Sequence, residues 1–551
     1  MANQLAKALA DPPAAAALAE LDAVLLGGGP APRPVLDTAA QAGIAVVRTY
    51  GSSETSGGCV YDGLPLDGVE VRIDAAAKQQ TFDGWGTSLA WWSNVVGERR
   101  GEKGGAVLAH TQKIDTTLSP PGAFPDAIRN RVADLMFHPT KGLGLTIARY
   151  NIGGSGWATP DKGNLRPGGD IASFLGPDGT TYDWGLDAAQ VWTLLAAKER
   201  GANLFEAFSN SPPYWMTISG RASGAVEASD DNLSPSKYGA FAEYLATVVR
   251  HFSDNHNITF ATLDPFNEPS TNYWWAGNVQ EGCHFDRASQ NAFLPLMKAE
   301  LDRAGVSPAT QLSASDETNM RDALETLQAY TPQALASIAQ INTHAYWGPS
   351  YPRLALGPAG ALEAGKRMWQ SEFGTGTAPV TAMADGLALA AQCAADLNLL
   401  KASAWVYWQA VEDLDGKDPT PWWGLAQLSF ANGKGLRLGK QYWALWQHSA
   451  HVRPGATVLA SPRPASLLAA LAPGGEALVL VLTRADARDG ATAVDVSSFL
   501  RGRPGVATVT RTSPSEDGED AGSLPLPAEW GGRFRVRLAA ESVTTVVVRA
   551  A

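Results

Sequence analysis

The middle of the chain alternates short apolar runs with longer stretches in which apolar residues recur at helical spacing. The stretches 238–252 and 292–304 are amphipathic in this way and predict helices. Eight apolar runs predict strands, at residues 82–89, 145–152, 203–209, 259–267, 311–315, 341–346, 367–372 and 403–408. Strands that alternate with helices are typical of βαβ units and of a closed parallel barrel. The pattern therefore predicts the α/β class, with a (β/α)8 TIM barrel over residues 73–450.

The period of the pattern changes toward the C-terminus. Short β-rich runs at 477–482, 533–538 and 542–548 are separated by turns rich in Gly, Pro and Asp. This pattern predicts a β-sandwich side domain over residues 451–551. A strand at 69–80, just before the barrel, is expected to join that sandwich.

The composition is that of a soluble globular protein. Hydrophobic residues make up 45% of the 551 residues and charged residues 18%. The formal net charge of −12 argues against nucleic acid as a partner, because phosphate binding requires a basic surface. There is no apolar run of about 18 residues or more, so we expect no membrane-spanning helix. The three cysteines follow no metal-ligand pattern, and we expect neither a metal nor an organic cofactor.

Tryptophan is frequent, and several of the 18 residues occur in clusters such as Trp91-Trp92 and Trp274-Trp275. Core packing is the simplest explanation for any single tryptophan. Neighbouring residues of a strand point to opposite faces, however, so an adjacent pair is harder to bury as a whole. Pairs at strand ends are therefore candidates for stacking against sugar rings.

Two glutamates carry the chemistry that the sequence predicts. Glu268 follows Asn267 at the end of the fourth apolar run, and Glu372 ends the seventh. Catalytic groups in a TIM barrel lie at the C-terminal ends of strands. Two carboxylates there can act as acid/base and nucleophile at a glycosidic bond, with Asn267 bound to the sugar 2-hydroxyl. The alternative for Asn267-Glu268-Pro269 is ordinary capping at the start of a helix.

A nucleophilic carboxylate must stay ionised, so Glu372 requires hydrogen-bond donors nearby. Candidate donors are Arg149 at the end of the second predicted strand and His344 and Tyr346 at the end of the sixth. A structural ion pair is a compatible alternative for Arg149. A buried core histidine is the alternative for His344.

Several motifs at the predicted strand ends resemble glycoside hydrolase family 30. The segment that begins at Phe82, FDGWGTSLAWW, is similar to the opening motif of that family, in a form similar to the branch that contains endo-β-1,6-galactanases. Further similar segments are ARYNIGG from Ala148, SNSPPYWM from Ser209 and WQSEFG from Trp369. The resemblance covers most of residues 73–551.

This resemblance implies a retaining mechanism with Glu268 as the acid/base and Glu372 as the nucleophile, at a carboxylate separation of about 5–5.5 Å. The partner it implies is a polysaccharide or oligosaccharide, namely the β-1,6-linked galactan side chains of arabinogalactan, cleaved within the chain. A β-1,6-glucanase or another β-glycosidase of the family is the alternative. The resemblance also implies that substrate is bound by Trp408 below the sugar and by Trp85, Trp91, Asn151 and Asn210 around it.

Residues 1–72 are rich in Ala and Gly and predict an extension separate from the barrel. The motif TYGSSET at 49–55 resembles the nucleotide-contacting motif of adenylate-forming ligases, and its surroundings resemble an internal piece of an o-succinylbenzoate–CoA ligase. The phosphate loop and the catalytic lysine of such ligases have no counterpart here. We therefore expect a fused or truncated fragment without ligase activity.

The location of the protein is left open by the sequence. Resemblance to family 30 implies secretion, whereas Asp11, Glu20 and Asp22 interrupt the apolar stretch that a signal peptide would need. We expect the protein to be a monomer.

Overall fold

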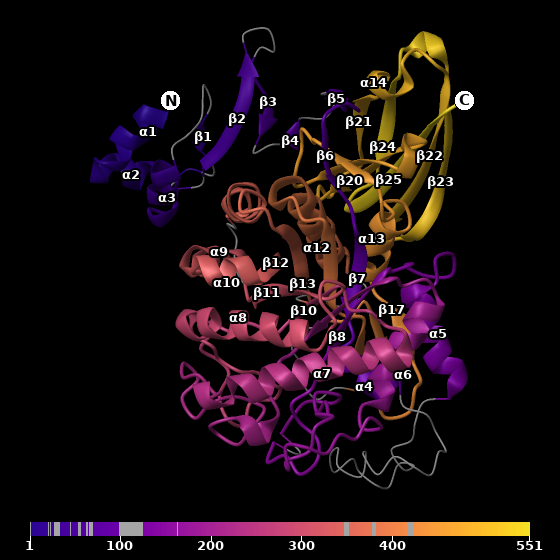
Figure 1. The fold of residues 1–551 in the computed structure, drawn as a ribbon. Helices are drawn as coiled ribbons and strands as arrows, with labels where there is room; N and C mark the ends of the chain where they lie inside the picture. The colour runs from indigo at the N-terminus through magenta and orange to yellow at the C-terminus, as the bar shows by residue number, and fades with distance from the viewer. Residues whose placement is uncertain are drawn as a thin grey trace.

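The structure is a computed structural model of the chain. It describes residues 2–19, 21, 24–26, 33–44, 46–52, 57–61, 64–65, 70–97, 125–161, 164–346, 352–376, 382–415 and 423–551. Figure 1 shows a barrel surrounded by helices, a β-sheet domain packed against one side of it, and a small N-terminal unit at the edge.

Eight parallel strands form a closed barrel, which confirms the predicted TIM-barrel fold. Each strand pairs with the next one along the chain, and β14 pairs with β7 to close the ring. The strands are β7 (Gly84–Ser88), β8 (Ile147–Asn151), β9 (Leu204–Phe208), β10 (Thr262–Asp264), β11 (Gln311–Glu317), β12 (Ile338–His344), β13 (Arg367–Phe373) and β14 (Ala404–Gln409). Their side chains are nearly all buried, because side chains fill the barrel and helices cover its outside.

The helices follow the predicted amphipathic stretches, and α7 (Tyr238–His256) shows the physical reason. Phe241, Leu245, Val248 and Phe252 recur every three or four residues and are all buried. The helix ends where Asn257 takes the left-handed conformation. The other helices of this part are α4 (Trp92–Val96), α5 (Asp126–Phe137), α6 (Ala188–Glu199), α8 (Arg287–Arg303), α9 (Met320–Ala329), α10 (Pro332–Ser337), α11 (Arg353–Leu356), α12 (Met383–Ala395) and α13 (Lys440–Ser449). Among the helices of the described ranges, none combines the length and the apolar character needed to cross a membrane.

Two sheets form the side domain. The larger has the strand order β23-β22-β25-β20-β19-β18-β6, and the smaller has the order β24-β21-β5. In β24, Phe534, Val536 and Leu538 are buried and the residues between them are exposed, as one face of a sheet against a core requires. The strands β5 and β6 precede the barrel in the chain and pair with β21 and β18. The elements are β5 (Glu70–Arg72), β6 (Lys78–Thr81), β18 (Thr457–Leu459), β19 (Leu467–Leu471), β20 (Ala477–Arg484), β21 (Gly490–Asp495), α14 (Ser497–Leu500), β22 (Gly505–Ser513), β23 (Glu516–Leu526), β24 (Arg533–Leu538) and β25 (Ser542–Ala550).

The N-terminal unit has a small sheet and a core cluster of its own. Leu5, Ala39 and Ile44 are the buried residues of that cluster. Its elements are α1 (Ala2–Leu9), α2 (Pro12–Ala19), β1 (Val24–Leu26), α3 (Arg33–Gln41), β2 (Val46–Ser52), β3 (Gly57–Tyr61) and β4 (Leu64–Pro65). In the ligase-like motif at 49–55, the first four residues belong to β2, and residues 53–55 lie outside the described residues.

Candidate active site

Glu268 and Glu372 both lie at the C-terminal ends of barrel strands. Glu372 belongs to β13, whereas Glu268 lies in the loop that follows β10. Strand β10 ends at Asp264, earlier than the predicted strand, and Glu268 takes a φ of 50°, which a strand does not allow. The Glu268 N–H donates to the carbonyl oxygen of Asp316 at 2.8 Å. The loop after β10 is thereby attached to the end of β11.

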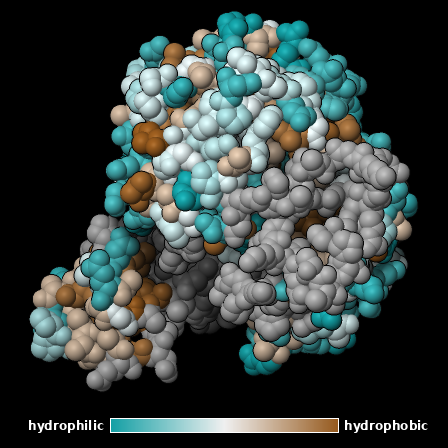
Figure 2. Space-filling model, turned by 90° about the horizontal axis from the view of Figure 1, so that it is seen from below, coloured by the Kyte–Doolittle hydropathy of each residue, from teal (hydrophilic) through white to brown (hydrophobic). Residues whose placement is uncertain are grey.

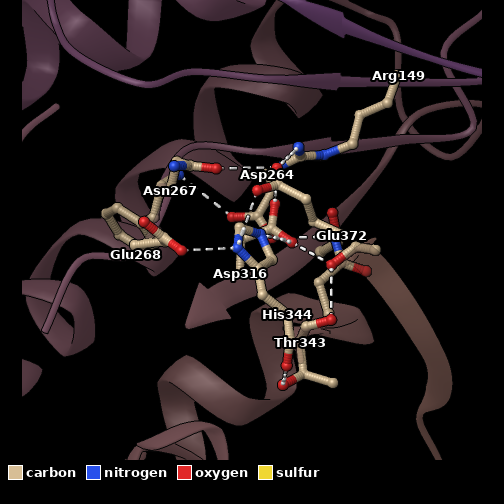
Figure 3. A network of polar contacts seen from close by, with 12 residues as sticks. Arg149, Asp264, Asn267, Glu268, Asp316, Thr343, His344 and Glu372 are labelled. Atoms are coloured by element: carbon tan, nitrogen blue, oxygen red, sulfur yellow. Dashed lines mark hydrogen bonds and ion pairs between the residues drawn. The ribbon is translucent and has the colours of Figure 1, made fainter. Parts of the chain in front are cut away.

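The two glutamates meet at His344, the last residue of β12 (Figure 3). Its Nδ1 lies 3.1 Å from Glu268 Oε1 and 3.5 Å from Glu372 Oε1. One oxygen of each glutamate and one ring nitrogen of His344 all lie within 4.8 Å of one another. The Nε2 atom of His344 lies 3.4 Å from Asp316 Oδ1. His344 is buried, but its neighbours are carboxylates, so it is not a core histidine in an apolar setting.

Arg149, in β8, is a second cation beside the glutamates. Its Nη1 donates to Glu372 Oε2 at 2.7 Å, and its Nη2 donates to Asp316 Oδ2 at 2.6 Å and to Asn267 Oδ1 at 3.2 Å. The guanidinium lies over the ring of Phe208, 3.5 Å from its centroid, and is fully buried. Arg149 thus donates to Glu372 and also forms a buried ion pair. These are the two compatible interpretations that the sequence allows.

Two tyrosines complete the contacts of the carboxylates. The Tyr346 hydroxyl donates to Glu372 Oε1 at 3.1 Å. The Tyr273 hydroxyl donates to Glu268 Oε2 and lies 3.0 Å from the Thr318 hydroxyl. Each glutamate therefore has one oxygen bound to a hydroxyl, while His344 lies between the two.

Asp316 is a site residue that the sequence analysis missed. The predicted strand stopped at residue 315, whereas β11 continues to Glu317. Asp316 is fully buried, binds Arg149 and His344, and accepts a hydrogen bond from the Ser371 hydroxyl. A usable signal was present, because Asp316 and Glu317 directly follow an apolar barrel strand, where functional side chains gather.

The buried charges shift one another's pKa values. Burial lowers the pKa of His344, but the carboxylates around it outweigh burial and raise that pKa to about 10. Burial raises the pKa of Asp316, and Arg149 and His344 more than reverse this, so that the net shift is downward. Burial raises the pKa of Glu372, and the cations His344 and Arg149 oppose that rise only in part. At neutral pH the site thus holds two cations among its carboxylates.

A pocket opens over these residues. Figure 2 shows hydrophilic residues with scattered hydrophobic ones on the coloured part of the face seen from below. Of the predicted residues, both glutamates, Trp91, Asn210, Asn267, Tyr346 and Trp408 line the pocket. Arg166, Tyr273, Gln280 and Trp423 also line it, and the sequence analysis missed them. Trp91 and Trp408 pack edge to face with their ring centroids 4.7 Å apart. The pocket thus combines aromatic walls with carboxylates, as binding of a sugar requires.

Trp85 is a correction to the sequence analysis. Its indole is buried against Phe82 and His448, and Nε1 donates to the carbonyl oxygen of Val452 at 2.8 Å. Successive side chains of a strand point to opposite faces, and β7 presents Trp85 to the packing layer between the barrel and α13. Trp85 therefore packs in the core and does not line the pocket.

Asn151 is a second correction. It is fully buried and lies behind the pocket, where its Oδ1 accepts a hydrogen bond from the Asn210 N–H at 3.3 Å. Its own N–H donates to Gln190 Oε1. Asn151 therefore supports Asn210 from below, and only Asn210 faces the pocket.

A metal ion could take one ligand atom each from Glu268, His344 and Glu372. Binding through the imidazole requires the neutral ring. The pKa of about 10 keeps His344 protonated at neutral pH, which opposes metal binding. The expectation of no metal stays a prediction.

The barrel, the paired carboxylates and the aromatic pocket define an enzyme that acts on a carbohydrate. The sequence model of O-Glycosyl hydrolase family 30 matches residues 121–345. The endo-beta-1,6-galactanase of Hypocrea rufa is 31% identical over 462 residues, which are 82% of this chain and 88% of that protein. The chain belongs to glycoside hydrolase family 30 and is a glycoside hydrolase.

Other relatives match shorter parts of the chain or share its fold. The exo-beta-1,6-galactobiohydrolase of Bifidobacterium longum subsp. longum is 26% identical over 61% of this chain and 26% of that protein. The catalytic domain of the GH30 xylanase C from Talaromyces cellulolyticus has the same fold, with a TM-score of 0.63 and 21% identity over 88% of this chain and 100% of that one. A probable 2-succinylbenzoate–CoA ligase of Mycobacterium tuberculosis is 76% identical over 78 residues, 14% of this chain and 20% of the ligase. The ligase resemblance is therefore real but restricted to a short segment.

Proposed function

We propose that Glu268 and Glu372 cleave a β-glycosidic bond with retention of configuration. The observation that carries this proposal is their separation: one oxygen of each lies within 4.8 Å of the other. Retaining glycosidases hold their two carboxyl groups about 5–5.5 Å apart, whereas inverting enzymes separate them by about 6.5–9.5 Å to admit a water molecule. The short separation supports direct attack by a carboxylate.

The contacts of the two glutamates support one assignment of roles. Glu372 accepts hydrogen bonds from Arg149 and Tyr346, which favour the carboxylate that a nucleophile requires. It attacks the anomeric carbon, the bond to the leaving oxygen breaks, and Glu268 donates its proton to that oxygen. In the second step water attacks the anomeric carbon, Glu268 takes the proton of the water, and the ester bond to Glu372 breaks.

The substrate we propose is β-1,6-linked galactan, such as the side chains of arabinogalactan, cleaved within the chain. Support comes from the relatives named for β-1,6-galactan linkages, an endo-acting and an exo-acting enzyme. The aromatic rings of Trp91, Trp408 and Trp423 in the pocket suit the apolar faces of neutral sugars. The net charge of −12 favours a neutral polymer over an anionic one.

The mechanism is tested by the anomer that is released first. Proton NMR of a digest of β-1,6-galactooligosaccharides should show the β-anomer first and the α-anomer only after mutarotation. Release of the α-anomer first would contradict a retaining mechanism. Glu372→Gln should abolish turnover. Glu268→Gln should still cleave an aryl glycoside, because the phenolate leaving group needs no proton. Glu300→Gln, in α8 and outside the pocket lining, is the matched control and should keep the wild-type rate.

The substrate is tested by parallel hydrolysis of β-1,6-galactan and β-1,6-glucan. These polymers differ in the orientation of the sugar 4-hydroxyl. We expect cleavage of the galactan, with short oligosaccharides of several lengths appearing early in the reaction. Faster cleavage of the glucan would assign the enzyme to the alternative substrate.

A further inference from the structure

Trp275 is an exposed aromatic residue on a segment that is attached to Glu268. The residue is 49% exposed, although the adjacent Trp274 is fully buried. The Trp274 Nε1 donates to the carbonyl oxygen of Glu268 at 2.9 Å, and the Tyr273 hydroxyl donates to the Glu268 carboxylate. Two consecutive residues before Trp275 are therefore bound to the proposed acid/base.

The backbone around Trp275 is held by a turn and by a neighbouring loop. The Asn278 N–H donates to the Trp275 carbonyl oxygen at 2.9 Å, and the Gly277 N–H donates to the Ser223 hydroxyl at 2.8 Å. Ala225 donates to the Trp274 carbonyl oxygen at 3.1 Å and accepts from the Ala276 N–H at 2.6 Å. The indole is thus presented on fixed backbone and does not sit at a free loop tip.

The Trp275 indole lies close to Gly277 in the turn. Its φ of 98° is unfavourable for other residues, and a Cβ there would lie 3.4 Å from the Trp275 ring. The ring is thereby supported from below by backbone. A half-exposed indole next to fixed backbone can stack its exposed surface on a sugar ring.

The segment that carries Trp275 begins and ends at the pocket. Tyr273 and Gln280 both line the pocket, and Trp275 lies between them in the chain. The carbonyl oxygen of Val279 accepts from the Arg166 N–H at 2.7 Å, and the Arg166 guanidinium lies over the Trp91 ring at 4.0 Å. Trp275 therefore stands at the rim of the pocket, on the side of Glu268.

Two apolar residues on the backbone segments near Trp275 are also exposed. Val279 is 53% exposed and Val226 is 78% exposed. Val226 follows Ala225, which pairs with Trp275 in a short β-bridge. Single exposed apolar residues are common on protein surfaces. Here, however, Val226 follows the residue that bridges to Trp275, and Val279 lies four residues after Trp275 on the same pocket-lining segment.

We propose that Trp275, with Val226 and Val279 beside it, binds the part of the galactan chain that leaves after cleavage. This inference rests on the proposed function. The acid/base donates its proton to the leaving oxygen, so the leaving chain lies on the side of Glu268. The ligand class is a chain of neutral hexoses, because the surface offers an aromatic face and aliphatic groups without a charged group among its three residues.

The test compares two substrates with opposite requirements. A β-1,6-galactan polymer extends over the leaving-group side, whereas a p-nitrophenyl β-1,6-galactobioside has only the aryl group there. Trp275→Ala should lower kcat/KM on the polymer about tenfold, the effect of one lost stacking contact, and leave the aryl substrate unchanged. Trp275→Phe should recover most of the polymer activity. Trp530→Ala is the matched control, because Trp530 is similarly exposed, at 45%, but lies in the side domain.

The outcomes separate this inference from the proposed function. Wild-type polymer rates in Trp275→Ala would overturn the inference, and so would equal losses on the two substrates, which would indicate a damaged site. The proposed function fails instead if the wild-type enzyme cleaves neither substrate. A selective loss on the polymer in Trp275→Ala, absent from Trp530→Ala, supports the inference.

Discussion

Arg149 and Glu372 form a buried ion pair, 2.7 Å from Nη1 to Oε2, although their strands are not neighbours in the barrel. Strand β8 is separated from β13 by β7 and β14 around the ring. The contact therefore crosses the mouth of the barrel by side chains alone. It brings a permanent positive charge to the proposed nucleophile, and Asp316 holds the other side of the same guanidinium at 2.6 Å.

Loss of the Arg149 charge should destabilise the fold. Arg149→Met leaves Asp316 and Glu372 without one of their two cations in a buried site, which costs about 3–5 kcal/mol in the free energy of unfolding. Urea unfolding followed by circular dichroism measures this. Arg303→Met is the control, because the Arg303 side chain is exposed and its ion pair with Glu300 contributes less than about 1 kcal/mol. Equal effects of the two substitutions would contradict the expectation.

The charge of His344 should make stability depend on pH in the alkaline range. The pKa of His344 in the folded state, about 10, is higher than that of an unfolded histidine, about 6.5. The folded state thus binds the proton more tightly, and this stabilisation is complete below about pH 6.5 and is lost as the pH rises through 10. The unfolding free energy of the wild type should fall more steeply between pH 7 and about 10 than that of His344→Asn. Parallel slopes would disprove a protonated His344, and His138→Asn, at the C-terminal end of α5, should follow the wild type.

The hydroxyl of Tyr346 should contribute to catalysis. Its hydrogen bond to Glu372 has a charged acceptor, and such bonds contribute about 1.5–3 kcal/mol. Tyr346→Phe should therefore lower kcat by roughly tenfold to a hundredfold. Tyr442→Phe is a matched control, because the Tyr442 hydroxyl is also buried and donates at 3.1 Å, to the carbonyl oxygen of Leu135. Unchanged kcat in Tyr346→Phe would remove Tyr346 from the catalytic set.

Loss of Trp85 should lower the stability of the fold, whereas loss of Trp408 should weaken substrate binding. Trp85 packs in the core, so Trp85→Ala should cost about 3–5 kcal/mol of unfolding free energy. At a temperature where the variant is folded, its KM should equal that of the wild type. Trp408→Ala should raise KM, because Trp408 lines the pocket. A raised KM in folded Trp85→Ala would restore the original assignment of Trp85 to the subsite.

The N-terminal unit should be dispensable for hydrolysis. Among the described residues, its core cluster runs from Leu5 to Val46, whereas β5, the first strand of the side domain, begins at Glu70. Deletion of residues 1–65 should leave kcat/KM on galactan within about twofold of the full chain, since less than 1 kcal/mol separates such rates. The melting temperature of the barrel should also be unchanged. A large loss of activity would show that the ligase-like unit supports the glycosidase.

Local patterns were sufficient to predict the barrel and the two glutamates. Apolar runs of strand length, separated by amphipathic helices, allow few folds, and polar residues at strand ends stand out against such runs. Asp316 was missed because the predicted strand stopped at residue 315, one residue short of it. Tyr273 was missed because its role depends on its contact with Glu268. Trp85 was misplaced because a motif does not say which face of its strand is buried.

The sequence by itself determined the class of fold, the order of the strands and the two carboxylates, since these follow from periodicity and from short motifs. Only the tertiary structure decided that one oxygen of each carboxylate lies within 4.8 Å of the other, with His344 between them. That distance depends on the closure of the ring and on the φ of Glu268, which no local pattern contains. The environment of each charge likewise arises only when strands far apart in the chain meet at the barrel mouth.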